Sequence, residues 1–132
     1  MDKLILVSYG QFCNGIKDSL EMILGPQPQI LTVPLLEEEG EADIKQKYND
    51  IVNKDDNITV FVDLLGGTPS NVMSQLLKEG QNFKLYTEMS LPMVISYISS
   101  IVLGQPKDFR VRAREGVVFI NDILNHIDDE DE

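Results

Sequence analysis

Two kinds of apolar spacing alternate four times along the chain, and this alternation limits the possible folds more than any other feature of the sequence. Short, nearly continuous apolar runs such as 3–8 and 58–64 are typical of strands that are buried on both faces. Between these runs, apolar residues recur at helical spacing. The alternation predicts an α/β fold, a flavodoxin-like three-layer sandwich with a mainly parallel central sheet and right-handed crossovers.

Glycines, prolines and changes of spacing set the expected bounds of the elements. Strands are predicted at 3–8, 29–33, 58–64 and 82–87, and helices at 12–24, 42–52, 68–80 and 92–104. Alternation with period two over 109–114 predicts a late edge strand that carries Arg110, Arg112 and Arg114 on one side. A last helix is expected over 116–126. We expect one domain over 1–127 and an acidic tail over 128–132.

Charge and composition exclude several classes of function. The net charge of −11 argues against a nucleic-acid partner, because such binding depends on Lys and Arg neutralising phosphates. Cys13 is the only cysteine, so no intrachain disulfide can form and a reducing compartment is expected. The N-terminus lacks the pattern of a signal peptide, and the longest apolar-rich stretch is shorter than the roughly 20 residues of a membrane span. We expect a cytoplasmic protein without direct membrane insertion.

The segment from Asp63 to Asn71 contains the most informative motif. A strand ends in a carboxylate, Gly66 and Gly67 follow, and Thr68 can cap a helix that has Pro69 at its first position. The N-terminus of a helix offers unpaired N–H groups and a partial positive charge, which favour an anion such as phosphate. A tight turn followed by a helix cap would need the same residues. The chemistry alone leaves both interpretations open.

Several motifs, in one order and spacing, resemble the mannose-family enzyme IIA domains of the sugar phosphotransferase system. The segment 63–71 resembles that family's Asp-Leu-Phe-Gly-Gly-Ser/Thr-Pro-Phe-Asn. The segment 20–25 resembles its Ala-Glu-Met-Ile/Leu-Leu-Gly, 90–93 its Asn-Leu-Pro-Met, and 114–116 its Gly-Arg/Lys-Glu-Gly. The resemblance covers nearly the whole chain.

The resemblance implies a phosphoryl-transfer site at the carboxyl ends of the first and third strands. In the family, a histidine after the first strand accepts a phosphoryl group from the histidine phosphocarrier protein and passes it to the IIB subunit. The resemblance implies Tyr9 at the acceptor position and Asp63 as the orienting carboxylate. It implies a phosphate-binding set of Gly10, Gly66, Gly67, Thr68 and Ser70, and a rim of Glu88 and Ser90. It implies no cofactor or metal, and a homodimer to which the late strand, exchanged between subunits, contributes.

Tyr9 is the main departure from the family pattern. A phenol with a pKa of about 10 is mostly protonated and needs activation before it can act as a nucleophile. We expect Asp63 to raise this pKa further, and Glu88 to repel a phosphorylated partner. The leading hypothesis is a degenerate enzyme IIA that binds or regulates phosphotransferase partners without carrying phosphate. The alternative is an active phosphoryl carrier with Tyr9 as an unusual or introduced acceptor.

Other assignments agree less well with the sequence. A receiver-like domain needs an acidic pair after the first strand to hold Mg²⁺, and Ser8-Tyr9 supplies none. A flavin site needs a hydroxyl-rich phosphate loop there, which 11–15 does not provide. We interpret His126, in the last predicted helix, as structural. Cys13 is expected to be a packed small residue rather than a reactive thiol.

Overall fold

The computed structural model describes residues 1–131, and the surroundings of side chains for residues 1–127. Four strands and six helices follow one another along the described chain. The first half runs β1 (Asp2–Tyr9), α1 (Phe12–Leu24), β2 (Ile30–Leu35), α2 (Glu41–Ile51) and β3 (Asn57–Val62). The second half runs α3 (Thr68–Lys78), β4 (Lys84–Tyr86), α4 (Leu91–Leu103), α5 (Arg110–Gly116) and α6 (Ile120–Asp131). The predicted α/β class is confirmed.

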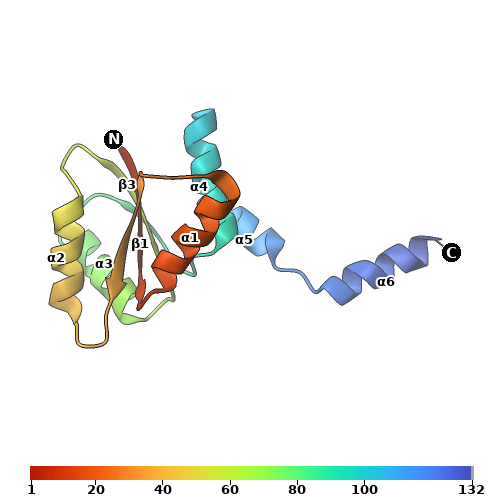
Figure 1. Ribbon diagram of the computed structural model, residues 1–132, viewed down its shortest axis with the longest axis horizontal. Coiled ribbons are helices and arrows are strands. Elements are labelled where there is room, and N and C mark those ends of the chain that lie inside the picture. Colours follow the sequence, from red (N-terminus) through yellow and green to blue (C-terminus); the bar gives the residue numbers. More distant parts are fainter. Residues whose placement is uncertain (132) are drawn as a thin grey trace.

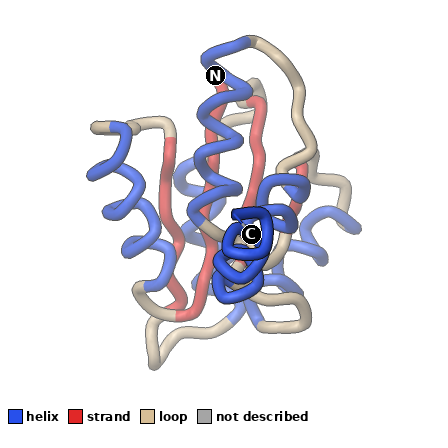
Figure 2. The backbone as a smooth tube through the Cα atoms, turned by 90° about the vertical axis from the view of Figure 1, so that its right-hand side faces the viewer, coloured by secondary structure: helices blue, strands red, loops and turns tan. Residues whose placement is uncertain are grey.

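The four strands form one parallel sheet in the order β2-β1-β3-β4. The strand β1 therefore lies between β2 and β3, and Val7 pairs with Val33 on one side and Val62 on the other. This order places the carboxyl ends of the first and third strands side by side, as a flavodoxin-like fold requires. Figure 2 shows the strands next to one another within the shell of helices.

Helices cover both faces of the sheet and produce three layers (Figure 1). On one face, Leu4 and Leu6 of β1 pack with residues of α1 and α4. On the other face, Ile5 and Val7 pack with residues of α2 and α3. Adjacent strand residues point to opposite faces, so a central strand must be apolar at every position. This explains why the run 4–7 is continuously apolar and fully buried.

The predicted late strand over 109–114 is wrong, because this segment forms the helix α5. The period-two pattern was based on only three arginines, which is a short run. Both Arg and Ala favour helices, so the segment is also compatible with a helix. Phe109 packs between α4 and the sheet, and the Asp108 carboxylate accepts a hydrogen bond from the Arg110 backbone N–H at 3.0 Å, close to the start of the helix. In helical geometry Arg110 and Arg114 are one turn apart and share a face, whereas Arg112 does not. The three arginines therefore do not form a stripe.

The last helix also differs from the expectation. It begins at Ile120 rather than 116 and continues through Asp131, past residue 128 where the acidic tail was expected to begin. Glu132 lies outside the described residues. Helix α6 extends away from the sandwich (Figure 1). In the described part of the chain, no helix combines the length and the apolar character that crossing a membrane requires.

Candidate functional site

The site lies at the carboxyl ends of β1 and β3, where the topology brings three separate segments together. Tyr9 ends β1, Asp63 directly follows β3, and Thr68 begins α3. The backbone N–H of Tyr9 donates to Asp63 Oδ2 at 2.7 Å, and the Tyr9 hydroxyl contacts Thr68. The structure thus brings together the acceptor position, the carboxylate and the threonine that the resemblance implied.

Asp63 binds backbone groups rather than the ring of Tyr9. Its Oδ2 accepts from the Tyr9 N–H, and its Oδ1 accepts from the Leu64 N–H at 2.9 Å. One carboxylate therefore fixes the end of β1 and the turn after β3. Hydrogen bonds to a carboxylate are about twice as strong as those between neutral groups. The two bonds to Asp63 therefore hold the two loops in fixed positions relative to each other.

The Tyr9 hydroxyl forms hydrogen bonds at the N-terminal end of α3. Its oxygen accepts from the Thr68 N–H at 2.8 Å, and its O–H donates to Thr68 Oγ1 at 3.2 Å. The first N–H groups of a helix have no partner within the helix, and they form the part of the helix that binds anions. In this chain the phenol oxygen occupies that position, although the Tyr9 side chain remains 45% exposed.

These hydrogen bonds change the expected ionisation of Tyr9. The side chain and the backbone of Thr68 hold the pKa of the phenol below its usual value of 10.0. Asp63 acts in the opposite direction, as the sequence predicted, but its effect is smaller. The expectation that the pKa is raised overall is therefore wrong. Hydrogen bonding that favours the phenolate outweighs the repulsion between two negative charges.

The two glycines have separate functions in the turn between β3 and α3. Gly66 has φ of +85°, a left-handed conformation that glycine adopts without strain. At Gly67, an added Cβ would lie 3.0 Å from the ring of Tyr9 and 3.4 Å from its hydroxyl, so the absence of a side chain lets the ring lie against the turn. Gly67 is also the N-cap of α3 and Thr68 its first residue, so the helix begins one position earlier than the predicted cap at Thr68 implied.

The remaining predicted site residues lie around this contact at different depths. Gly10 follows β1 and donates its backbone N–H to the Leu35 carbonyl at 2.7 Å. Ser70, in the first turn of α3, is only 2% exposed. Ser90 is the N-cap of α4, and its hydroxyl accepts from the Met93 N–H at 3.4 Å. Of these three, Gly10 is the one that lines the pocket beside Tyr9.

Glu88 points into the site loop. Both of its carboxylate oxygens lie 3.3 Å from the Leu65 backbone N–H, which donates to them. Its backbone has φ of +53°, which is uncommon for a residue other than glycine and costs conformational energy. The next residue, Met89, donates its N–H to the Val62 carbonyl at 3.0 Å and fixes this segment against β3. A carboxylate therefore contacts the turn between β3 and α3.

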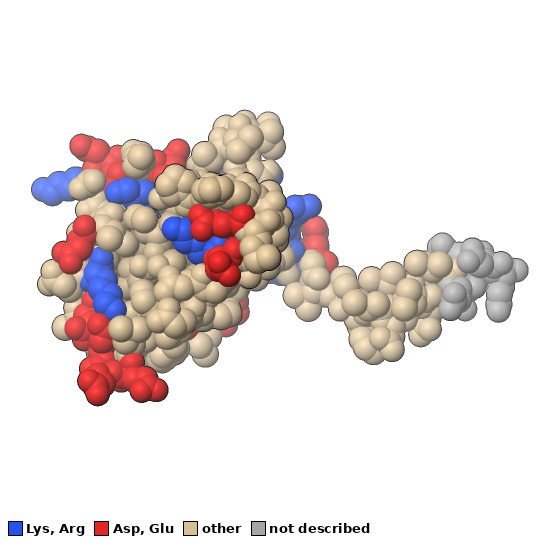
Figure 3. Space-filling view, viewed as in Figure 1, with Lys and Arg blue, Asp and Glu red and all other residues tan. Residues whose placement is uncertain are grey.

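Sequence reasoning missed the wall of the adjoining pocket. A cavity of about 550 Å³ opens beside Tyr9 and Thr68, and its other lining residues are Gly10, Leu35, Leu36, Glu37, Glu39, Gly40 and Glu41. An acidic run such as the one after β2 is by itself typical of solvated surface, so its residue types do not mark it as part of a site. Figure 3 shows acidic side chains gathered at the lower left, over the turn between β2 and α2. In a parallel sheet the carboxyl ends of all strands lie at one edge, so the loop after β2 lies near the ends of β1 and β3. The predicted parallel sheet was therefore a signal that this loop could border the site.

Two other reactive side chains, Cys13 and His126, do not line the pocket beside Tyr9. Cys13 is fully buried, its N–H donates to Ser8 Oγ at 2.9 Å, and burial raises the pKa of its thiol. The prediction of a packed small residue is confirmed. His126 belongs to α6, which extends away from the sandwich.

Comparisons with known proteins assign the chain to a family. The family model EIIA-man, described as the PTS system fructose IIA component, matches residues 3–110. The PTS system fructose-specific EIIA component of Bacillus subtilis (strain 168) is 26% identical over 102 residues, which are 75% of this chain and 70% of that protein. The sorbose-specific EIIA component of Lacticaseibacillus casei is 25% identical over 70% of this chain and 69% of its own length.

Solved structures agree with this assignment. A phosphotransferase system component EIIA from Streptococcus agalactiae aligns with a TM-score of 0.78 and 30% identity, over 92% of this chain and 98% of that one. A putative sugar phosphotransferase system permease from Klebsiella pneumoniae aligns with a TM-score of 0.81 and 25% identity, over 93% of each chain. The motifs, the parallel sheet and the matched residues 3–110 therefore show that this chain belongs to the mannose-type EIIA family of the sugar phosphotransferase system.

Proposed function

We propose that this chain is a degenerate EIIA component, which binds or regulates phosphotransferase partners without carrying a phosphoryl group. The observation that supports it is the contact between Tyr9 and Thr68. The phenol oxygen accepts the Thr68 N–H at 2.8 Å, at the position where a helix N-terminus would hold a phosphoryl oxygen. Tyr9 also replaces the imidazole whose nitrogen would be nucleophilic at neutral pH.

Charge around the site supports the same proposal. Asp63 lies at one side of Tyr9, Glu88 reaches the turn at Leu65, and Glu37, Glu39 and Glu41 line the adjoining pocket. Lys47 pairs with Glu39 and lowers the pKa of that carboxyl, so it offsets part of the negative charge. A phosphoryl group would add about 1.5 to 2 further negative charges to this surface. Repulsion would then oppose both phosphorylation and the approach of a phosphorylated partner.

One observation favours the alternative, an active phosphoryl carrier with Tyr9 as the acceptor. The lowered pKa of the phenol increases the fraction of phenolate, which is the nucleophilic form. In that reaction the phenolate oxygen would bond to phosphorus, the phosphorus–nitrogen bond of the phosphohistidine would break, and the released imidazole would take a proton. The product would be an acid-stable phosphotyrosine ester, a poorer donor to IIB than a phosphoramidate.

A phosphorylation assay separates the two proposals. The protein is incubated with labelled phosphoenolpyruvate, enzyme I and the histidine phosphocarrier protein, beside the variants Tyr9→His and Tyr9→Phe. We expect no label on the unaltered chain, and acid-labile label on Tyr9→His if the rest of the site still functions. Acid-labile label on the unaltered chain would overturn the degenerate assignment. Acid-stable label that disappears in Tyr9→Phe would establish the alternative.

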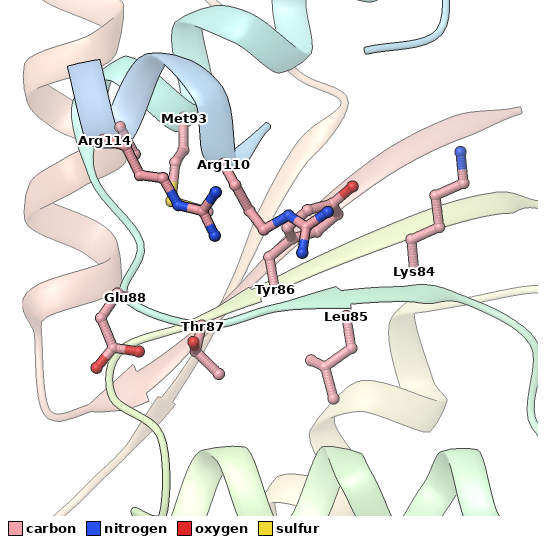
Figure 4. A pocket seen from close by; sticks show the side chains of 9 residues that line it. Lys84, Leu85, Tyr86, Thr87, Glu88, Met93, Arg110 and Arg114 are labelled. Carbon is pink, nitrogen blue, oxygen red and sulfur yellow. The ribbon is translucent and has the colours of Figure 1, made fainter. Parts of the chain in front are cut away.

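The proposal includes a homodimer in the cytoplasm, with the histidine phosphocarrier protein and IIB as partners. The outer edge of β4 borders a groove of about 620 Å³, and Figure 4 shows Tyr86, Arg110 and Arg114 around it. Exposed apolar side chains follow α5 and continue onto α6: Val117, Val118, Phe119, Ile120, Ile123, Leu124 and Ile127. Such a stretch is unusual on the surface of a monomer and fits exchange of this segment between two copies. Sedimentation analysis should give the mass of a dimer, and a monomer would refute this part.

A further inference from the structure

The edge of the sheet that carries Tyr9 also exposes large apolar side chains. The strands β2, β1 and β3 are adjacent and parallel, so the connections after all three begin at this edge. Each connection contributes at least one large apolar side chain that is 42% or more exposed: Tyr9, Phe12, Leu36, Leu64 and Leu65. We call these five residues the apolar face. Exposed apolar patches on soluble proteins often mark surfaces that bind another protein.

Contacts within the chain place members of the apolar face close together. Tyr9 and Leu36 line the same pocket of about 550 Å³. The Tyr9 ring also lies against the turn that carries Leu64, because a Cβ at Gly67 would be 3.0 Å from the ring and 3.4 Å from the Leu64 carbonyl. Leu65 is the next residue of this turn. The apolar face therefore extends from the end of β2, past Tyr9, to the turn after β3.

Exposed carboxylates surround the apolar face. Glu37 and Glu41 line the pocket, and Glu88 contacts the turn after β3. None of these three glutamates forms an ion pair with another residue that the structure describes, whereas Lys47 is paired with Glu39. Figure 3 shows the acidic side chains gathered over the turn between β2 and α2. An apolar centre with a negative rim complements a protein surface that has an apolar centre and a rim of Lys and Arg.

A phosphoryl group at the centre of such a partner would be unfavourable here. The N-terminal end of α3, which could hold an anion, already binds the Tyr9 hydroxyl through the Thr68 N–H at 2.8 Å. The Asp63 carboxylate contacts the backbone of Tyr9, and the Glu88 carboxylate contacts that of Leu65. A phosphoryl group carries about 1.5 to 2 negative charges, and charges within about 8 Å are poorly screened at physiological salt. The same partner therefore fits better without its phosphoryl group.

We propose that the apolar face binds a phosphocarrier protein in its unphosphorylated form and discriminates against the phosphorylated form. This inference rests on the proposed function, in which the chain binds phosphotransferase partners without carrying phosphate. The partner presents an apolar centre with Lys and Arg around it. The fraction of this chain that is bound then depends on the phosphorylation state of the partner, which gives the chain a way to regulate according to that state.

Titration with the two forms of one partner tests this proposal. The full-length, isotope-labelled chain is titrated with the histidine phosphocarrier protein, first unphosphorylated and then kept phosphorylated by phosphoenolpyruvate and a catalytic amount of enzyme I. Phosphoenolpyruvate without enzyme I is the control for the added anion. We expect saturable nuclear magnetic resonance shifts of amides near Tyr9 and Leu65. The affinity should be at least about tenfold higher for the unphosphorylated form, and added salt should reduce this preference.

Three variants locate the surface and the source of the preference. Leu65→Ser changes a 74% exposed side chain of the apolar face and should weaken binding of the unphosphorylated form at least about fivefold. Val102→Ser is the matched control, because Val102 is 77% exposed but lies in the last turn of α4, and affinity should be unchanged. The double variant Glu37→Gln, Glu41→Gln removes two negative charges and should narrow the difference between the two forms.

The possible failures can be told apart. Equal or tighter binding of the phosphorylated form, with no label on this chain, overturns this inference alone, because the chain would still bind the partner without carrying phosphate. Equal effects of Leu65→Ser and Val102→Ser overturn the assignment of the surface. Absence of saturable binding of either form overturns both this inference and the proposed binding role. Acid-labile label on the unaltered chain overturns the proposed function, and this inference with it.

Discussion

Phe109 anchors the segment between α4 and α5 to the sheet. Truncation of its side chain tests most directly whether this packing stabilises the fold. The side chain is 4% exposed. Its ring centroid lies 5.7 Å from that of Phe61, 5.3 Å from Tyr86 and 5.9 Å from Tyr97. These contacts join β3, β4 and α4 around one side chain. The substitution Phe109→Ala removes all of them at once.

The expected loss of stability follows from this burial. Truncation of a buried phenylalanine to alanine costs about 3–5 kcal/mol, because apolar contacts are lost and a cavity remains. A domain of this size has a free energy of unfolding of about 5–15 kcal/mol, so the loss is a large fraction of the total. For a chain of this length it corresponds to a fall of about 11 to 18 °C in melting temperature. The fold should survive, since the other core residues are unchanged.

Urea and thermal unfolding followed by circular dichroism measure this loss. Phe12→Ala is the matched control, because Phe12 is 50% exposed and its truncation should cost less than about 1 kcal/mol. Phe109→Ala could lower the free energy of unfolding no more than Phe12→Ala does. In that case Phe109 does not anchor the segment between α4 and α5 to the sheet, and the explanation given for helix α5 is wrong.

Two further predictions concern ionisation. Because the pKa of Tyr9 is lowered in the folded chain, Tyr9 favours folding above pH 10, and this contribution is lost as the pH falls through the folded pKa. Ultraviolet titration should find one phenol with a pKa below 10, and Thr68→Val should raise it; an unchanged value in Thr68→Val would refute the assignment. The Asp56 carboxylate, 2.7 Å from Lys3 Nζ, also has a lowered pKa, so its contribution is present above pH 3.8 and is lost as the pH falls through the folded pKa. Asp56→Asn should therefore lose less stability on acidification than the unaltered chain, and equal losses would contradict this.

Sequence reasoning located the four strands of the sheet and the first four helices because each has a local cause. The continuous apolar run of β1 reflects burial on both faces, and Gly66 with Gly67 marks the turn before α3. The meeting of Tyr9, Asp63 and Thr68 followed from a rule of parallel sheets rather than from any contact visible in the sequence.

The segment 109–116 shows where local reasoning fails. Three alternating arginines are compatible with either a strand or a helix, and the sequence offers no partner strand to decide. The outcome depends on Phe109, which packs on residues from β3, β4 and α4. Those contacts are long-range, so no window of local sequence contains them.

By itself, the sequence determined the α/β class and the family resemblance, which implies Tyr9 at the acceptor position. Only the tertiary structure decided what the Tyr9 hydroxyl does. It binds Thr68, a residue 59 positions away, and this hydrogen bonding reverses the predicted direction of the pKa shift. Residue type fixes the chemistry of a group, whereas its ionisation depends on distances of about 3 Å that the packing of β1, β3 and α3 sets.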